Sequence, residues 1–226
     1  VEGLEAKAVA QGIDGINRTV GKELRAGSTS NLVFVKGGAT AQDLASTMSF
    51  LLEGRSAFVS GQTWRVGPAK VQHEVSPRPF EGKVVVVTGA ARGIGAAIAR
   101  TFARDGAEVV AVDIPQAGDA LAKVANEIKG SALQLDITAE DAGEKIAKHV
   151  ARVLGAEKKI WAIVHNAGIT RDRMLANLDE KLWGSVLDVN LAAEMRINDY
   201  LLNNDVPGGL ADEARIVGIA STSGVA

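Results

Sequence analysis

The segment that most constrains this chain spans residues 84–95 and reads VVVVTGAARGIG. Four consecutive β-branched valines predict a strand that is buried on both faces, as in a parallel sheet. Three glycines follow, and a helical pattern with apolar side chains on one face begins after them. A strand, a glycine-rich turn and a helix N-terminus together form an anion site, because free N–H groups and the positive end of the helix dipole face a phosphate. The segment therefore predicts a dinucleotide-binding turn, and the alternative is a plain tight turn.

The glycines of this turn are spaced G-x-x-x-G-x-G. A glycine lets the backbone approach a pyrophosphate that any Cβ would hold away. We assign the contacts with the cofactor to five residues of the turn: Gly89, Arg92, Gly93, Ile94 and Gly95.

An acidic residue stands at the distance expected for a ribose-binding carboxylate. Residues 108–113 predict the second strand, and Asp113 lies at its carboxyl end, 18 residues past Gly95. A carboxylate there accepts hydrogen bonds from both ribose hydroxyls and repels a 2′-phosphate, so the sequence favours NAD(H) over NADP(H). Arg92 is the opposing feature, because it could pair with a 2′-phosphate, and Asp113 could instead be an ordinary turn residue at a strand end.

Composition restricts the remaining classes of function. The 226 residues are 46% hydrophobic, with a formal net charge of −2 and a pI near 6.0. Without a basic block, a nucleic-acid partner is not expected, and no apolar run approaches membrane-spanning length. The absence of cysteine fits a reducing compartment, so we expect a cytoplasmic protein. The three scattered histidines show no metal-ligand spacing, so we expect no metal site.

Strand and helix patterns alternate along the rest of the chain. Further strands are predicted at 132–136, 160–165 and 214–221, and helices at 117–128, 138–154 and 179–202, with Thr138 as the N-cap of the second. This order predicts an α/β fold with a Rossmann-type doubly wound parallel sheet. Ligands bind such sheets at the carboxyl ends of the strands, where several polar or glycine positions fall: Gly89, Asp113, Asp136, Asn166 and Ser221.

Several of these motifs resemble one enzyme family. The turn at 88–95 is similar to the cofactor loop of short-chain dehydrogenases/reductases, and Asn166-Ala167-Gly168 matches a further motif of that family. The segments at 169–172, 189–191 and 219–224 look like its 3-oxoacyl-[acyl-carrier-protein] reductase branch. The resemblance covers residues 80–226.

The resemblance implies roles for individual residues. Asn166, Ala167 and Gly168 would line the cofactor site, and Asp136 with Ile137 would contact the adenine. As catalytic residues, Asn190 would hold a water in a proton relay and Ser221 would hydrogen-bond the substrate carbonyl. Alternatives remain: Asn166 could mainly tie two strands together, Asn190 could be a helix kink or a buried hydrogen bond, and Ser223 competes with Ser221.

The chain departs from the family pattern at the proton donor. The family uses a tyrosine with a lysine four residues later, about a dozen residues beyond the serine, and this sequence stops at Ala226. Its single tyrosine, Tyr200, has no lysine four residues on. We therefore expect the chain alone to hold the cofactor half of an active site and not to catalyse.

Residues 1–67 resemble the closing part of a second domain of the same family. A helix at 8–24, a strand at 31–35, a helix ending at 49–52 and a last strand segment within 56–67 follow the family order, with Lys7 at the lysine position and Gly3 at the tyrosine position. Residues 68–80 predict a linker, and residues 81–226 a truncated NAD-binding domain. The high-molecular-weight kind of 3-oxoacyl-[acyl-carrier-protein] reductase has a degenerate, flavodoxin-like domain before an active one, so we interpret the chain as an internal piece of such a protein.

The sequence thus supports one principal function with alternatives. The whole protein is expected to reduce 3-oxoacyl thioesters of acyl carrier protein or CoA to 3-hydroxyacyl thioesters with NADH, NADPH being less favoured. By family analogy it would be a homo-oligomer, either a dimer of two-domain chains or a tetramer. The alternatives are a non-catalytic dinucleotide-binding or assembly module, another dehydrogenase acting on a different carbonyl or alcohol, and a circularly permuted fold in which the two parts associate.

Overall fold

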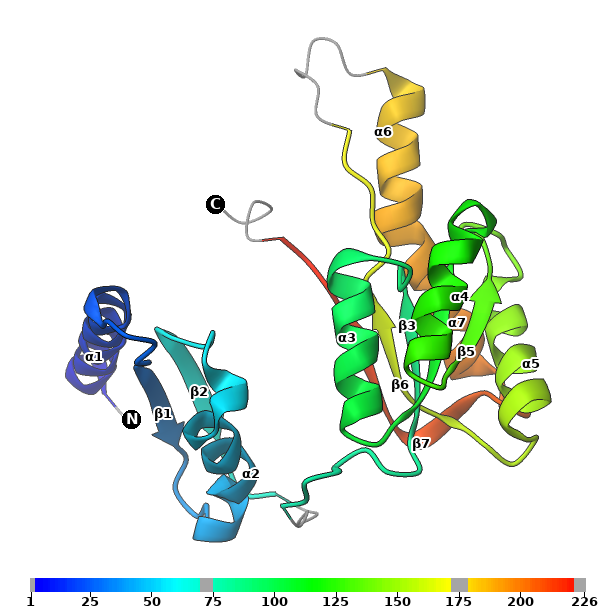
Figure 1. The fold of residues 1–226 in the computed structure, drawn as a ribbon. Helices are drawn as coiled ribbons and strands as arrows, with labels where there is room; N and C mark the ends of the chain where they lie inside the picture. The colour runs from blue at the N-terminus through cyan, green and yellow to red at the C-terminus, as the bar shows by residue number, and fades with distance from the viewer. Residues whose placement is uncertain (1–2, 70–74, 172–178, 222–226) are drawn as a thin grey trace. The chain divides into compact units, whose positions relative to one another are not determined.

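The computed structural model describes residues 3–69, 75–171 and 179–221. The chain forms two compact units, Val1–Pro77 and Arg78–Ala226 (Figure 1). The boundary lies inside the predicted linker. Phe80, from that linker, packs its ring 4.9 Å from the ring of Phe102 and 5.4 Å from that of Trp161, so it belongs to the second unit.

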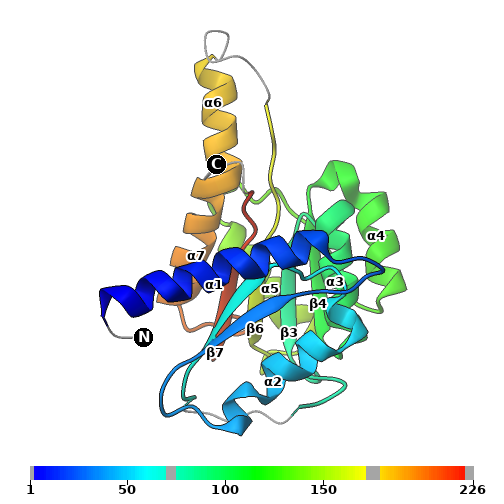
Figure 2. The same cartoon turned by 90° about the vertical axis from the view of Figure 1, so that its left-hand side faces the viewer.

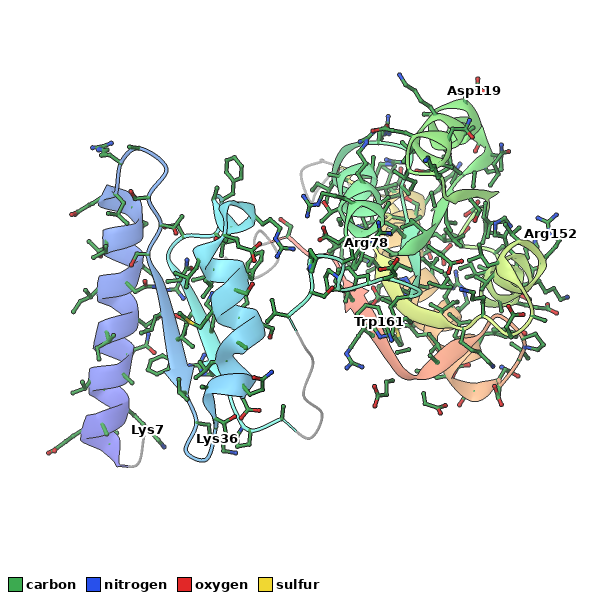
Figure 3. The ribbon with its side chains drawn as sticks, turned by 60° about the horizontal axis from the view of Figure 1, so that its bottom comes forward. Lys7, Lys36, Arg78, Asp119, Arg152 and Trp161 are labelled. Carbon is green, nitrogen blue, oxygen red and sulfur yellow. The ribbon has the colours of Figure 1, made fainter. Side chains whose placement is uncertain are left out.

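The first unit is a small two-stranded parallel sheet between two helices. Helix α1 lies on one side of the strands and α2 on the other (Figure 3). The ring of Phe50 in α2 packs 6.0 Å from that of Trp64. The strand predicted at 31–35 is confirmed, whereas the first helix begins earlier than predicted. The elements are α1 (Leu4–Glu23), β1 (Asn31–Val35), α2 (Ala41–Leu52), a short 3-10 turn η1 (Gly54–Ser56) and β2 (Gln62–Val66).

The second unit is built on a five-stranded sheet in the order β5-β4-β3-β6-β7, with every pair parallel. The doubly wound parallel fold predicted from the sequence is confirmed. The chain moves from β3 to β4 and β5 in one direction and then returns to β6 on the other side of β3. The strand order therefore reverses beside β3, where such folds bind ligands. The strands are β3 (Val84–Thr88), β4 (Glu108–Asp113), β5 (Ser131–Gln134), β6 (Ile160–His165) and β7 (Leu210–Gly218).

Helices cover both faces of this sheet. Alternate residues of β3 face opposite ways, so Val84 and Val86 pack against α5 and α7 while Val85 and Val87 pack against α3 and α4. All five residues of β3 are buried, which explains their uninterrupted β-branched sequence. The elements are α3 (Gly93–Arg104), η2 (Pro115–Ala117), α4 (Gly118–Glu127), α5 (Ala142–Leu154), α6 (Glu180–Leu187), a π-turn η4 (Asp188–Ala192) and α7 (Ala193–Asn203).

Three local predictions need correction. Helix α5 begins at Ala142 after Asp141, and Thr138 does not cap it, because its hydroxyl donates to the carboxylate of Asp136 at 2.7 Å. Strand β7 begins at Leu210, earlier than predicted, and ends at Gly218. The helix predicted over 179–202 contains a π-turn in its middle, and α6 extends beyond the carboxyl edge of the sheet (Figure 2).

Among the helices of the described ranges, none combines the length and apolar character that crossing a bilayer requires.

Candidate dinucleotide site and adjoining cavity

The glycine turn joins β3 to α3 in a conformation that needs its glycines. Gly89 has φ +66° and Gly93 has φ +57°, both in the left-handed region. A Cβ at Gly95 would lie 2.1 Å from the carbonyl oxygen of Gly89, which no side chain permits. A Cβ at Gly93, in contrast, would meet no atom within 4 Å. The turn is thus closely packed on its protein side and open at the N-terminus of α3, as an anion site requires.

Asn166 ties this turn to the end of β6. Its side-chain amide donates to the backbone oxygens of Thr88 at 3.1 Å and Gly89 at 3.2 Å. The hydroxyl of Thr88 accepts the backbone N–H groups of Asn166 at 3.0 Å and Ala167 at 3.1 Å. The alternative interpretation of Asn166 as a link between two strands therefore describes its contacts, and a direct contact with cofactor stays a prediction.

Asp113 lies beside the same turn. One carboxylate oxygen accepts the backbone N–H of Ala91 at 2.9 Å, and the other accepts that of Ile114 at 2.8 Å. These two bonds orient the carboxylate and leave further lone pairs on each oxygen. Arg92 is exposed at the N-cap position of α3, on the same side of the sheet. The structure thus places Asp113 and Arg92 at the same turn, and their roles in the choice of cofactor stay predictions.

Asp136 and Ile137 follow β5 at the same sheet edge. The carboxylate of Asp136 accepts the backbone N–H of Thr138 at 2.9 Å and its hydroxyl at 2.7 Å. These bonds hold the pKa of Asp136 below its usual range, so the exposed group stays ionised. Ile137 is buried and lies next to the cavity described below.

A cavity of about 390 Å³ lies at the carboxyl ends of β3, β6 and β7. It brings together the motifs at 166–168, 189–190 and 219–221, which the sequence separates widely. Its lining comprises Thr88, Ile137, His165, Asn166, Ala167, Gly168, Ile169, Thr170, Val189, Asn190, Glu194, Ile219, Ala220 and Ser221.

Asn190 lies within the π-turn between α6 and α7. Its side-chain oxygen accepts the backbone N–H of Ile169 at 2.8 Å, and its amide donates to the carbonyl of Ile169 at 2.9 Å. This two-bond clamp fixes the loop after β6 against the helix. π-turns occur frequently at functional sites. The side chain of Asn190 is occupied in this clamp, so its predicted role in holding a water is not shown by its contacts.

Ser221 borders the cavity three residues beyond the end of β7, whereas its competitor Ser223 lies outside the described residues. Tyr200 does not approach this cavity. Its ring packs against Gly143 of α5, where an added Cβ would meet its side chain at 2.8 Å. Among the described residues, the cavity lining contains neither a tyrosine nor a lysine.

Two titratable residues of the cavity, His165 and Glu194, are not among the site residues that the sequence predicts. His165 is only 6% exposed and donates from Nε2 to the side-chain oxygen of Asn198 at 2.8 Å, while its Nδ1 has no partner among the described residues. Burial lowers the pKa of His165 below 6.5, against the opposing effects of Asn198 and the Glu194 charge. The sequence places Glu194 four residues after Asn190, about one helical turn, and this spacing indicates that the two side chains lie on the same side of a helix.

Comparison with known proteins identifies the family. Residues 83–226, well over half of the chain, match the family model described as short chain dehydrogenase. The chain belongs to the short chain dehydrogenase family. A curated relative, the 3-oxoacyl-[acyl-carrier-protein] reductase FabG of Thermotoga maritima, is 34% identical over 151 residues, which cover 64% of this chain and 60% of that protein. The chain spans about half to three fifths of the length of the curated reductases it matches.

Solved structures of short chain dehydrogenases have a similar fold. A putative short chain dehydrogenase from Pseudomonas syringae is 29% identical with a TM-score of 0.58, and the match covers 69% of this chain and 64% of that one. A blue fluorescent protein from a metagenomic library, in complex with NADPH, is 25% identical with a TM-score of 0.55, covering 62% of this chain and 56% of that one.

Proposed function

We propose that the whole protein is an NAD-dependent oxidoreductase that reduces 3-oxoacyl thioesters to 3-hydroxyacyl thioesters with NADH. One arrangement carries the proposal: the glycine turn, Asp113 and the 390 Å³ cavity share the carboxyl edge of one parallel sheet. The residues fit a dinucleotide, because the clearance at Gly93 and the close packing at Gly95 leave room for a pyrophosphate on the open side of the turn. When bound, the reduced nicotinamide supplies the hydride.

Asp113 supports NADH as the preferred cofactor. Its carboxylate is held in place by the backbone N–H of Ala91 in the turn and that of Ile114 after β4, and it retains free acceptor capacity for ribose hydroxyls. A 2′-phosphate at that place would meet a like charge. Arg92 supports the opposite preference, and among the described residues it forms no ion pair that would prevent it from binding a phosphate.

The choice of 3-oxoacyl thioesters is supported by the motifs around the cavity and by the names of the relatives. Ser221 borders the cavity, so its hydroxyl can donate a hydrogen bond to the 3-oxo group and polarise it for hydride attack at C3. The proton that the resulting alkoxide needs is not assigned to any described residue. Asn190 keeps the loop at Ile169 in place beside this site. The acyl group would be carried by acyl carrier protein or CoA.

An exposed apolar stripe supports the proposal of a homo-oligomer. Trp183, Leu187, Leu191 and Met195 recur every four residues along α6, the π-turn and α7, and each is at least 40% exposed. Unpaired apolar helix faces of this kind mark protein–protein contacts. A second copy of the same stripe would cover it symmetrically.

The cofactor preference is tested by Asp113→Ala in the full-length protein. We expect the dissociation constant for NADH to rise about tenfold or more, since hydrogen bonds to a charged group are lost, with a smaller change for NADPH. Asp119→Ala removes an exposed carboxylate on α4 and serves as the control (Figure 3). An equal loss of affinity for both cofactors would show that Asp113 does not bind the ribose hydroxyls.

The substrate class is tested separately by following NADH oxidation with a 3-oxoacyl-CoA, a 3-oxoacyl-acyl carrier protein and a simple cyclic ketone. The proposal expects turnover with the thioesters and little with the ketone. Turnover only with the ketone would favour another dehydrogenase of the family, and cofactor binding without turnover on any of them would favour the non-catalytic module.

A further inference from the structure

The first unit contains a second cavity, of about 780 Å³, which the proposed reaction does not use. It lies between α1 and the segment of the sheet where β1 and β2 end, the usual ligand-binding edge of a parallel sheet. All of its lining belongs to the first unit: Lys7, Ala10, Gln11, Asp14, Arg18, Phe34, Val35, Lys36, Thr63, Arg65, Val66 and Gly67.

Several lysines and arginines of this unit lie around the same cavity because of their spacing along the helix and the strands. Lys7 and Arg18 are eleven residues apart, about three helical turns, so they lie on one side of α1. Arg65 stands beside Phe34 in the register of β1 and β2, and its guanidinium lies 5.4 Å from the centre of that ring. Lys36 follows β1 directly, and Lys7 and Lys36 lie at the same end of the unit (Figure 3). Four of the seven lysines and arginines between residues 3 and 69 therefore line one cavity.

The positive charge of this cavity is largely unbalanced. Its single carboxylate belongs to Asp14, which accepts hydrogen bonds from the hydroxyl of Thr63 and from Nε of Arg18. These bonds lower the pKa of Asp14, so it stays ionised and is already paired with Arg18. Within the described ranges, Lys7, Lys36 and Arg65 form no ion pair. Four cations thus face one cavity with a single carboxylate, which is paired with Arg18 and also attracts Arg65, so the cavity keeps an excess of positive charge.

We propose that this cavity binds a phosphorylated small molecule that also carries hydroxyl groups, such as a sugar phosphate or nucleotide. Lys7, Lys36 and Arg65 would bind the phosphate, since cationic donors form the strongest hydrogen bonds to its oxygens. The oriented carboxylate of Asp14 would accept hydroxyl groups of the same ligand. The volume lies in the range of small-molecule sites. The proposal rests on the first unit alone and is independent of the dinucleotide site.

The experiment is a calorimetric titration of the full chain with ribose 5-phosphate and, separately, with inorganic pyrophosphate. We expect saturable binding of both. The double substitution Lys7→Ala/Lys36→Ala should weaken both by at least about tenfold, because two charge-assisted bonds are lost. Asp14→Asn should weaken ribose 5-phosphate, whose sugar hydroxyls lose a charged acceptor, and should not weaken pyrophosphate, which has no sugar hydroxyls and gains from the removal of a like charge.

Two controls distinguish binding in this cavity from general charge attraction and from binding at the glycine turn. Lys22→Ala/Arg25→Ala removes two exposed cations of the same unit that do not line the cavity, and it should leave binding unchanged. Gly95→Ala disrupts the glycine turn of the second unit and should leave the binding of ribose 5-phosphate, which has no pyrophosphate group, unchanged. Far-ultraviolet circular dichroism checks that each variant folds, which is expected because both lysines are exposed.

Three outcomes would overturn the proposal. The first is no saturable binding of either probe at about 10 mM ligand. The second is equal weakening by the two double substitutions, which would indicate general charge attraction. The third is loss of ribose 5-phosphate binding in Gly95→Ala, which would place this ligand on the glycine turn.

Discussion

The two units use the same elements but bury them to very different degrees. Strand β3 has neighbours on both sides and helices on both faces, and all five of its residues are buried. Strands β1 and β2 are parallel and flanked by helices as well, yet neither contains a fully buried residue. A central strand needs a sheet of several strands around it, and two strands cannot supply that. The local pattern therefore sets the type of element, while the number of neighbours sets how much of its stability comes from packing.

The largest expected effect tests this difference in the core. Ile163→Ala in β6 removes a fully buried side chain and should destabilise the second unit by about 2–5 kcal/mol. Leu32→Ala in β1 is the matched change at a half-buried position and should cost no more than about 1–2 kcal/mol, since less area is lost from the interior. Hydrogen exchange of peptides from β6 and β1 measures the two separately, and equal losses would contradict the comparison.

The next effect compares a glycine from each unit. Gly95→Ala forces a methyl group against the Gly89 carbonyl, so we expect a loss of about 1–3 kcal/mol in stability together with loss of NADH binding. Gly12→Ala lies in the middle of α1, where an added Cβ meets nothing within 4 Å, and should stabilise by up to about 1 kcal/mol. Thermal unfolding and NADH fluorescence titration report both quantities. Undiminished NADH affinity in Gly95→Ala would contradict the assignment of the turn.

The smallest effect is a difference in acid sensitivity. Because the pKa of His165 is lowered below 6.5 in the folded protein, the unfolded state takes up its proton first as the pH falls, and stability declines below about pH 6.5. His165→Asn should make this decline shallower between about pH 7 and pH 5. His149, whose pKa burial also lowers, accounts for a remaining slope.

Exchange protection of β1 serves as the internal reference for this experiment, because no histidine lies in β1 or β2. An unchanged slope in His165→Asn would mean that His165 does not titrate as the structure indicates.

How much the sequence could predict differs between elements. The start of β3 follows from four consecutive valines, and the bounds of β4 follow from a valine-rich run, interrupted only by Ala111, between Glu108 and Asp113; such runs are typical of buried parallel strands. The prediction that Thr138 caps α5 was wrong because a threonine hydroxyl can either accept a backbone N–H of the helix or donate to a nearby carboxylate. Here it donates to Asp136. The π-turn was not predictable from periodicity, because its apolar spacing differs little from that of a continuous helix.

The candidate site likewise contains residues that the sequence could predict and residues that it could not. The glycine turn and Asp113 were predictable because a strand, a turn and a second strand place them together by local rules. His165 and Glu194 enter the cavity only through the packing of α7 against β6, which a sequence does not display. The cavity of the first unit likewise depends on how α1 lies across two strands.

The π-turn at Asp188–Ala192 also determines what a change in the length of this segment would do. A π-turn accommodates one residue more than a regular helix of the same rise, so the helical winding on its two sides stays in phase. Deleting a single residue from this turn would therefore restore regular winding and leave α7 facing as it does now, with Ala193, Ile197 and Leu201 still packed toward the sheet. The same deletion within α7 would instead rotate the residues beyond it by about 100°. The segment can thus lose one residue at the π-turn without losing its packing, and nowhere else along this helix.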